Sequence, residues 1–134
     1  MAILTTQQNR RFSDLDLNFN IHPIKKDINK NYDQTAVINS IKNLILTRHY
    51  ERKFHPEIGS NTMKSLFENI DKITASNLER EIQQTIDNFE PRASVKKVVA
   101  TPDYDNNGYT ITMDFTIVNI TNTITIKFFL QRVR

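Results

Sequence analysis

The spacing of the hydrophobic positions changes after Pro91. From residue 33 to residue 89 apolar side chains recur every three or four positions, a spacing typical of amphipathic helices. Beyond Pro91 apolar and polar residues alternate, which is typical of half-buried β-strands. The pattern predicts an α+β fold in which the helices come first and the strands last.

The first predicted helix covers residues 34–48, with Asp33 as its N-cap. Its apolar positions are Val37, Ile38, Ile41, Leu44 and Ile45. Pro56 and Gly59 interrupt the periodicity in the stretch that follows, because both residues favour turns. We therefore expect an ordered loop after the first helix.

Two more helices are predicted before Pro91. A short helix is expected over residues 62–70, and its buried side would carry Met63, Leu66, Phe67 and Ile70. A longer helix is expected over residues 75–89, capped by Thr74. The apolar stripe of the longer helix consists of Leu78, Ile82, Ile86 and Phe89.

Three strands are predicted over residues 94–101, 109–118 and 123–131. Asn107-Gly108 supplies the positive backbone angles that a tight hairpin turn needs. Alternate residues from Tyr109 to Ile117 face the core, and the threonines and Asp114 between them face solvent. We expect a three-stranded antiparallel meander with two main helices and one short helix packed on its apolar face.

A sheet of this size has two edges with unpaired backbone groups. Lys96, Lys97, Lys127 and Arg132 are candidates for blunting these edges. An edge is also able to accept a strand from a neighbouring protein, which is a common mode of recognition. Both interpretations of the edges remain open.

Residues 1–32 form a separate segment, rich in Asn, Asp and Lys. Apolar residues occupy every second position from Leu15 to Ile21, including Leu17 and Phe19, and Phe12 precedes them. This alternation predicts one strand or an extended arm with a single apolar face, suited to docking on its own core or on another subunit. We assign residues 1–32 to an N-terminal arm or edge strand and residues 33–134 to the α+β domain.

Composition narrows the class of protein. The 134 residues are enough for one domain, and the hydrophobic share of 38% is that of a globular chain. There is no cysteine, which excludes disulfides, thiolate nucleophiles and Cys-ligated zinc. The start of the sequence lacks the apolar core of a signal peptide, and no apolar run is long enough to span a membrane. We expect a soluble protein made in a cytoplasm.

Several kinds of chemistry find little support. The net charge of +3 comes from basic pairs that acidic residues separate, without a stacking motif for nucleic acid. The only glycines, Gly59 and Gly108, form no phosphate-binding loop. In "HYERKFHPE" (49–57) the histidines and glutamates match no metal-binding spacing, so we expect surface histidines with local salt bridges. No cofactor is predicted.

A glycosidase is the alternative that deserves a test. Its acid and base would come from two of five glutamates: Glu57, Glu68, Glu79, Glu81 and Glu90. Such chemistry needs two carboxyl groups about 5–10 Å apart across a cleft that fits a sugar. A small domain with short loops has little material for such a cleft. A cell-wall glycosidase remains the alternative function.

The sequence Glu90-Pro91-Arg92 lies where the last helix meets the first strand. Proline pushes the preceding residue out of the helical region, so Pro91 explains why the helix ends. A rigid proline also holds a neighbouring carboxylate and guanidinium at fixed angles for a partner. The chemistry of these residues alone leaves both interpretations open.

Residues 47–92 resemble the baseplate wedge proteins of contractile-tailed phages. That family is similar to the sheath-initiator subunit of type VI secretion baseplates. The features that carry the resemblance are Thr47-Arg48, then Phe54-x-Pro56-Glu57-x-Gly59, then "LFEN" (66–69), and last Phe89-Glu90-Pro91-Arg92. Their order and spacing together, rather than any one of them, indicate the family.

The resemblance implies a structural, non-enzymatic protein of the virion tail baseplate, made in the host cytoplasm and present in six copies around the tail. Glu90, Pro91 and Arg92 would bind the helical core bundle of the wedge. Arg48 and the turn of Phe54, Pro56, Glu57 and Gly59 would support this contact or touch the same bundle. The strands would exchange with the tail sheath protein and template its first ring. Hub or tube proteins are further candidate partners, whereas nucleic acid and membrane are not expected.

Overall fold

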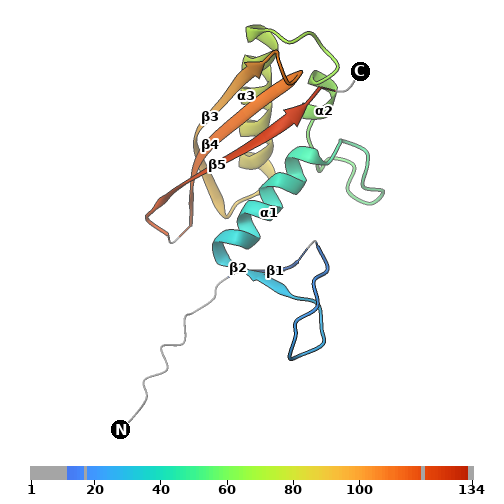
Figure 1. The fold of residues 1–134 in the computed structure, drawn as a ribbon, viewed down its shortest axis with the longest axis vertical. Coiled ribbons are helices and arrows are strands. Elements are labelled where there is room, and N and C mark those ends of the chain that lie inside the picture. The colour runs from blue at the N-terminus through green and yellow to red at the C-terminus, as the bar shows by residue number, and fades with distance from the viewer. Residues whose placement is uncertain (1–11, 17, 119, 133–134) are drawn as a thin grey trace. The chain divides into compact units, whose positions relative to one another are not determined.

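The computed structural model describes residues 12–16, 18–118 and 120–132. The chain divides into two compact units, one up to Val37 and the other from Ile38 to Arg134. Three helices and two antiparallel sheets make up the fold, so the predicted α+β class is confirmed (Figure 1). The elements are β1 (Ser13–Leu15), β2 (Lys30–Tyr32), α1 (Asp33–Leu46), α2 (Thr62–Ser65), α3 (Lys72–Phe89), β3 (Ala93–Asp103), β4 (Gly108–Ile117) and β5 (Thr123–Gln131).

The first unit contains a short antiparallel ladder between β1 and β2. The prediction of one strand from Leu15 to Ile21 is wrong, because β1 ends at Leu15 and Ile21 makes only an isolated bridge to Ile28. Phe19 has a positive φ of 52°, which turns the chain. Leu17 lies outside the described residues. The side chains of Leu15, Phe19 and Ile21 are exposed, so they form no buried apolar face.

Asp16 explains why the predicted strand stops. Its carboxylate accepts the backbone N–H of Asn18 at 3.2 Å and the side-chain amide of Asn20 at 3.0 Å. The N–H of Phe19 donates to the carbonyl oxygen of Asp16 at 3.0 Å. Short polar side chains of this kind offer the backbone local hydrogen bonds that compete with strand pairing. The alternation of apolar residues does not reveal that competition.

The helix α1 closely follows the prediction, with Val37, Ile41 and Ile45 fully buried. Asp33 is its first residue rather than the residue before it. The helix ends at Leu46, two residues earlier than expected. There the backbone N–H and the hydroxyl of Thr47 both donate to the carbonyl oxygen of Asn43, at 2.9 and 2.7 Å.

The short helix α2 is a single turn and not the predicted segment 62–70. Leu66 is buried as expected, but 52% of the surface of Phe67 is exposed, so the predicted buried side is wrong at that position. A single turn cannot bring residues at helical spacing onto one continuous face. The chain leaves the helix at Leu66, and Phe67 turns toward solvent.

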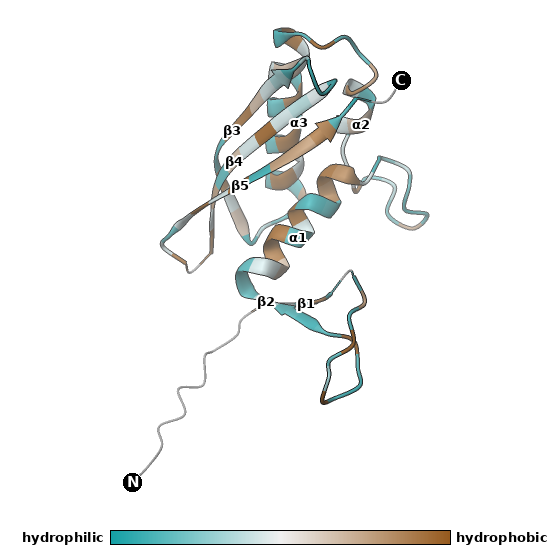
Figure 2. Cartoon of the chain, viewed as in Figure 1, coloured by the Kyte–Doolittle hydropathy of each residue, from teal (hydrophilic) through white to brown (hydrophobic). Residues whose placement is uncertain are grey.

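The long helix α3 has its buried stripe where it was predicted, at Leu78, Ile82 and Ile86. The predicted cap is wrong, because Asp71 and not Thr74 is the N-cap. The carboxylate of Asp71 accepts the backbone N–H of Thr74 at 2.7 Å. In Figure 2 α3 alternates between brown and teal, as an amphipathic helix should.

The main sheet has the order β3-β4-β5 with antiparallel pairing throughout, which confirms the predicted meander. Alternate residues of β4 are buried, from Tyr109 to Ile117, as the period-two pattern indicated. On β5 the same pattern buries Ile124, Ile126 and Leu130. The helix α3 packs along β3, behind the sheet in the view of Figure 1.

The connection between β3 and β4 differs from the expected tight turn. It runs over residues 104–107, and only Asn107 has a positive φ, of 53°. Gly108 is the first residue of β4, where space and not backbone angle requires glycine. A Cβ there would lie 2.4 Å from the carbonyl oxygen of Leu130 and 2.5 Å from Cζ of Phe129. The side chain of Phe129 therefore occupies the space that Gly108 leaves.

We predict that Gly108→Ala lowers the free energy of unfolding by about 1–3 kcal/mol, as overpacking does elsewhere. The added methyl group meets the backbone of β5, which cannot move without weakening its pairing with β4. Urea denaturation measures the change. Asn107→Gly is the control, because it adds no atoms, and its effect should stay within about 0.5 kcal/mol. Equal stability of Gly108→Ala and wild type would contradict this account.

Candidate functional site

The chain makes a tight turn where α3 meets β3. Glu90 has φ −126° and ψ 78°, outside the helical region, as expected for a residue before proline. The N–H of Ala93 donates to the carbonyl oxygen of Glu90 at 3.1 Å and closes a turn with Pro91 at its second position. Because β3 starts at Ala93, helix and strand follow one another without a longer linker.

The carboxylate of Glu90 lies inside this turn, with only 3% of the side chain exposed. Arg92 donates to it twice, from Nε at 2.5 Å and from Nη2 at 2.7 Å. Ser40, in the middle of α1, donates its hydroxyl to the same carboxylate. One buried charge thus connects α1, the end of α3 and the start of β3.

Burial raises the pKa of the Glu90 carboxyl, but the hydrogen bonds from Arg92 and Ser40 and the charge of Arg92 outweigh it. The pKa of Glu90 consequently lies below its ordinary value of 4.5, and the group is ionised at neutral pH. The two charges of the motif are paired with each other inside the chain. Pro91 is exposed, and 27% of the Arg92 side chain reaches the surface.

A second group of predicted residues lies on the loop between α1 and α2. At the neck of this loop Arg48 forms an isolated parallel bridge with Ser60. Gly59 has a φ of 141°, and a Cβ there would lie 2.8 Å from the backbone carbonyl of Arg48. Only glycine fits this close backbone approach, so Gly59 closes the neck.

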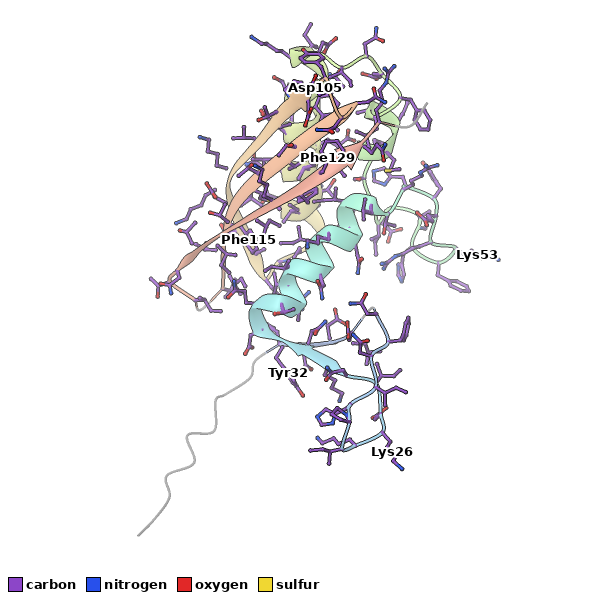
Figure 3. All side chains as sticks on the ribbon, viewed as in Figure 1. Lys26, Tyr32, Lys53, Asp105, Phe115 and Phe129 are labelled. Atoms are coloured by element: carbon purple, nitrogen blue, oxygen red, sulfur yellow. The ribbon has the colours of Figure 1, made fainter. Side chains whose placement is uncertain are left out.

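The outer part of the loop is held by its own backbone. The N–H of Tyr50 donates to the carbonyl oxygen of Pro56 at 2.9 Å. Between these residues Phe54 is 92% exposed. Figure 3 labels Lys53 next to it, at the outer end of the loop and away from the helices. The loop is closed by backbone hydrogen bonds, and it presents an aromatic side chain to solvent.

The neck of the loop and the end of α3 line one pocket. It has a volume of about 180 Å³, and its walls include His49 and Gly59 from the neck and Thr85, Asn88 and Phe89 from α3. Phe89 directly precedes Glu90 in the chain. Two stretches that were predicted separately are therefore neighbours in the folded domain.

The histidines near this loop make local contacts. Nδ1 of His55 lies 3.2 Å from the carboxylate of Glu57, and Nδ1 of His49 lies 3.1 Å from the carbonyl oxygen of Glu57. Over residues 12–16, 18–118 and 120–132 no group of three His, Cys, Asp or Glu side chains is arranged to hold a metal ion. In the same part of the chain no helix is both long and apolar enough to cross a membrane.

Three of the five glutamates considered for a glycosidase are engaged in folding contacts, whereas Glu57 and Glu68 are exposed. Glu79 accepts the N–H of Ala100 at 2.8 Å, and Glu81 accepts the N–H of Asn61 at 3.2 Å. Glu90 is buried in its ion pair. A glycosidase acid needs a raised pKa, whereas hydrogen bonds hold the pKa of Glu90 below its usual range.

Sequence reasoning missed the contribution of Ser40. It stands 50 residues before Glu90, and a serine within a helical pattern does not indicate what its hydroxyl contacts. The pairing of Glu90 with Arg92 was easier to anticipate, because opposite charges flank a proline. The folded chain shows in addition that Glu90 is buried, whereas part of the Arg92 side chain reaches the surface.

Residues 32–122 match the family described as baseplate wedge protein gp25. The chain belongs to this family. A relative from Enterobacteria phage T4, the baseplate wedge protein gp25, is 33% identical over 115 residues, with 83% of each chain covered. The resemblance seen in the sequence is thereby confirmed. The protein is a baseplate wedge protein of a contractile tail, and its place is the tail baseplate of a virion.

Solved structures share the fold at lower identity. A Geobacter sulfurreducens protein, provisionally named a tail lysozyme, has a TM-score of 0.70 at 19% identity and covers 75% of this chain and 92% of its own. A chain of the anti-feeding prophage baseplate has a TM-score of 0.63 at 20% identity, covering 92% and 87%. A chain of the postcontracted pyocin R2 baseplate has a TM-score of 0.62 at 14% identity, covering 79% and 98%.

We predict that the Glu90 ion pair makes stability depend on pH. Because folding lowers the pKa of Glu90, its contribution is present above pH 4.5 and is lost as the pH falls through the lower folded-state pKa. Glu90→Gln should lower the free energy of unfolding by about 3 kcal/mol at neutral pH. This difference from wild type should shrink in acid, which urea denaturation at several pH values measures.

The control for this prediction is Glu68→Gln, which changes an exposed glutamate. Its effect on the free energy of unfolding should stay small at every pH. A Glu90→Gln difference that is the same at neutral and acid pH would show that the charge of Glu90 does not contribute to stability.

Proposed function

We propose that this protein is a non-enzymatic assembly component that joins the helical core bundle of the baseplate wedge to the first ring of the tail sheath. The bundle contact is formed around Arg92, and the sheath contact is formed along β5. The observation that carries the proposal is that the domain leaves one sheet edge open while it closes the other.

The guanidinium of Arg92 suits a protein contact. Arginine offers planar, paired donors to carboxylates and main-chain oxygens, and its weak hydration lowers the cost of burying it at an interface. Here two bonds to Glu90 hold its orientation before a partner arrives. An ordered side chain loses less conformational freedom on binding. We extend the proposed contact to the loop neck, which lines a pocket together with this end of α3, and to the exposed Phe54.

Arg92→Ala should weaken binding to the wedge core-bundle protein of the same genome about a hundredfold or more, because a charged, hydrogen-bonded contact is lost. Titration of the purified bundle protein against the full chain measures this loss. Arg80→Ala is the matched control, since Arg80 is an exposed arginine on α3. Equal binding by Arg92→Ala and wild type would mean that Glu90-Pro91-Arg92 only ends the helix and does not bind the bundle.

The edge at β3 is closed by the chain itself. The N–H of Ala100 points away from β4 and donates to the carboxylate of Glu79 at 2.8 Å. Pro102 lies two residues further on, facing the same way, and has no N–H to offer. The register also shifts between Val95 and Lys97, which bends the strand. Three successive features therefore prevent another strand from pairing with β3.

The edge at β5 carries the exposed Lys127 but has no proline and no shift of register. The N–H of Arg132 donates to the carbonyl oxygen of Asn107 at 2.9 Å, which sets the alternation of bonds along the β4–β5 ladder. By that alternation, N–H and C=O groups point away from β4 at Thr123, Thr125, Lys127, Phe129 and Gln131. No strand of the described chain pairs with this edge. It has the length and exposure that strand addition from a sheath protein requires.

Sixfold symmetry would complete this arrangement. Identical subunits around a tail axis present identical edges at equal spacing, so that each β5 meets an equivalent sheath subunit. Contacts with hub or tube proteins fit the same place in the baseplate. The five outward positions of β5 would then set the register of the first ring.

Lys127→Pro should abolish binding of the sheath protein from the same phage, because proline removes an outward N–H at the middle of β5. Proline is tolerated on edge strands where the N–H faces solvent, so the sheet should persist. Lys127→Ala is the control, since it removes the side chain and keeps the N–H. Pull-down of the sheath protein measures binding, and circular dichroism checks the fold. Full binding by the folded proline variant would exclude β5 as the sheath contact.

A further inference from the structure

The hydroxyl of Ser40 is used differently from the hydroxyls of Thr47 and Thr85. Thr47 and Thr85 each donate to the carbonyl oxygen four residues earlier, at 2.7 and 2.8 Å, which is the usual choice at the end of or within a helix. Ser40 instead donates across the domain to the carboxylate of Glu90. A helical residue has thus given up the local bond for a contact 50 residues away in sequence.

The carboxylate of Glu90 therefore has two kinds of donor. Ser40 and Nη2 of Arg92 both donate to Oε2, and Nε of Arg92 donates to Oε1. The bond from Ser40 restricts rotation of the Glu90 carboxylate. The guanidinium of Arg92 is bonded to both oxygens of that carboxylate, so its orientation follows that of the carboxylate. The direction in which Arg92 faces its surroundings accordingly depends on a residue of α1.

We propose that Ser40 and Glu90 are positioning residues that orient Arg92 for the core bundle, and that Glu90 itself does not touch the bundle. This inference rests on the proposed function of Arg92. Only 3% of the Glu90 side chain is exposed, against 27% for Arg92, so a docked protein reaches the Arg92 side chain and not the Glu90 carboxylate. The acidic residue of the motif acts through the basic one.

A purely structural role for Ser40 leads to different expectations. If its bond only joined α1 to α3, removing it would lower stability but leave the affinity of the folded protein unchanged. A positioning role lowers affinity, and it also loosens the Arg92 side chain in the free protein. Affinity and side-chain order therefore have to be measured on the same variants.

The experiment uses the full chain with Ser40→Ala, Ser40→Thr and, as a matched control, Ser76→Ala on the exposed face of α3. Titration calorimetry gives the affinity for the core-bundle protein of the same genome. Solvent exchange of the Arg92 Nε–H group, followed by NMR, reports its order. Ser40→Ala should weaken binding about three- to tenfold and speed that exchange, since one hydrogen bond to a charged group is lost. Ser40→Thr should restore both, and Ser76→Ala should change neither.

Wild-type affinity in folded Ser40→Ala would overturn the inference, and so would weakened binding with unchanged exchange at Arg92. Should Ser40→Ala fail to fold, Ser40→Cys, which keeps a weaker donor at the same position, gives the same two readouts with a smaller loss expected. Arg92→Ala is measured in parallel. If it binds as wild type does, the proposed function of Arg92 itself fails, whereas weakened binding by Arg92→Ala together with wild-type binding by Ser40→Ala rejects the positioning alone.

Discussion

The buried carboxylate of Glu90 constrains how the elements of the second unit, from Ile38 to Arg134, are arranged. Taking an ionised carboxylate out of water costs several kcal/mol, and only well-placed donors offset that cost. The donors come from Ser40 on α1 and from Arg92 at the start of β3, while the carboxylate itself ends α3. Because no single element satisfies the charge, all three must be in place together. A charge that is expensive to bury thus fixes where the helices meet the sheet.

The helix α3 links this constraint to the sheet edges. Its C-terminal end carries the turn that presents Arg92, and its middle carries Glu79, which occupies the Ala100 N–H on the β3 edge. One helix therefore orders the Glu90-Pro91-Arg92 turn and covers part of the β3 edge, while no strand of the described residues pairs with the outer edge of β5 (Figure 1). An assembly protein needs this asymmetry, because two open edges would allow unregulated strand pairing.

Whether a feature could be predicted from the sequence depended on how far apart along the chain the interacting residues lie. The helices and strands were anticipated because their periods of 3.6 and 2 are local properties, visible within a dozen residues. The N-cap at Asp71 was missed although it is local, since Thr74 is an equally acceptable capping residue. The contact of Ser40 with Glu90 was out of reach, because nothing in a single sequence pairs positions so far apart. The exposure of Phe67 was missed because its predicted burial assumed a helix over residues 62–70, whereas α2 is a single turn.

The same contacts also determine how two of the glutamates considered for a glycosidase are held in this fold. Fold likeness to a protein provisionally named a tail lysozyme, at 19% identity, carries no activity, since function resides in the site and not in the fold. A glycosidase acid must hold its proton near neutral pH, which requires a raised pKa. In this chain Arg92 and Ser40 instead stabilise the charged form of Glu90, and Glu79 is bonded to the backbone of β3. These hydrogen bonds engage Glu79 and Glu90 in the fold, whereas Glu57 and Glu68 are exposed on the surface.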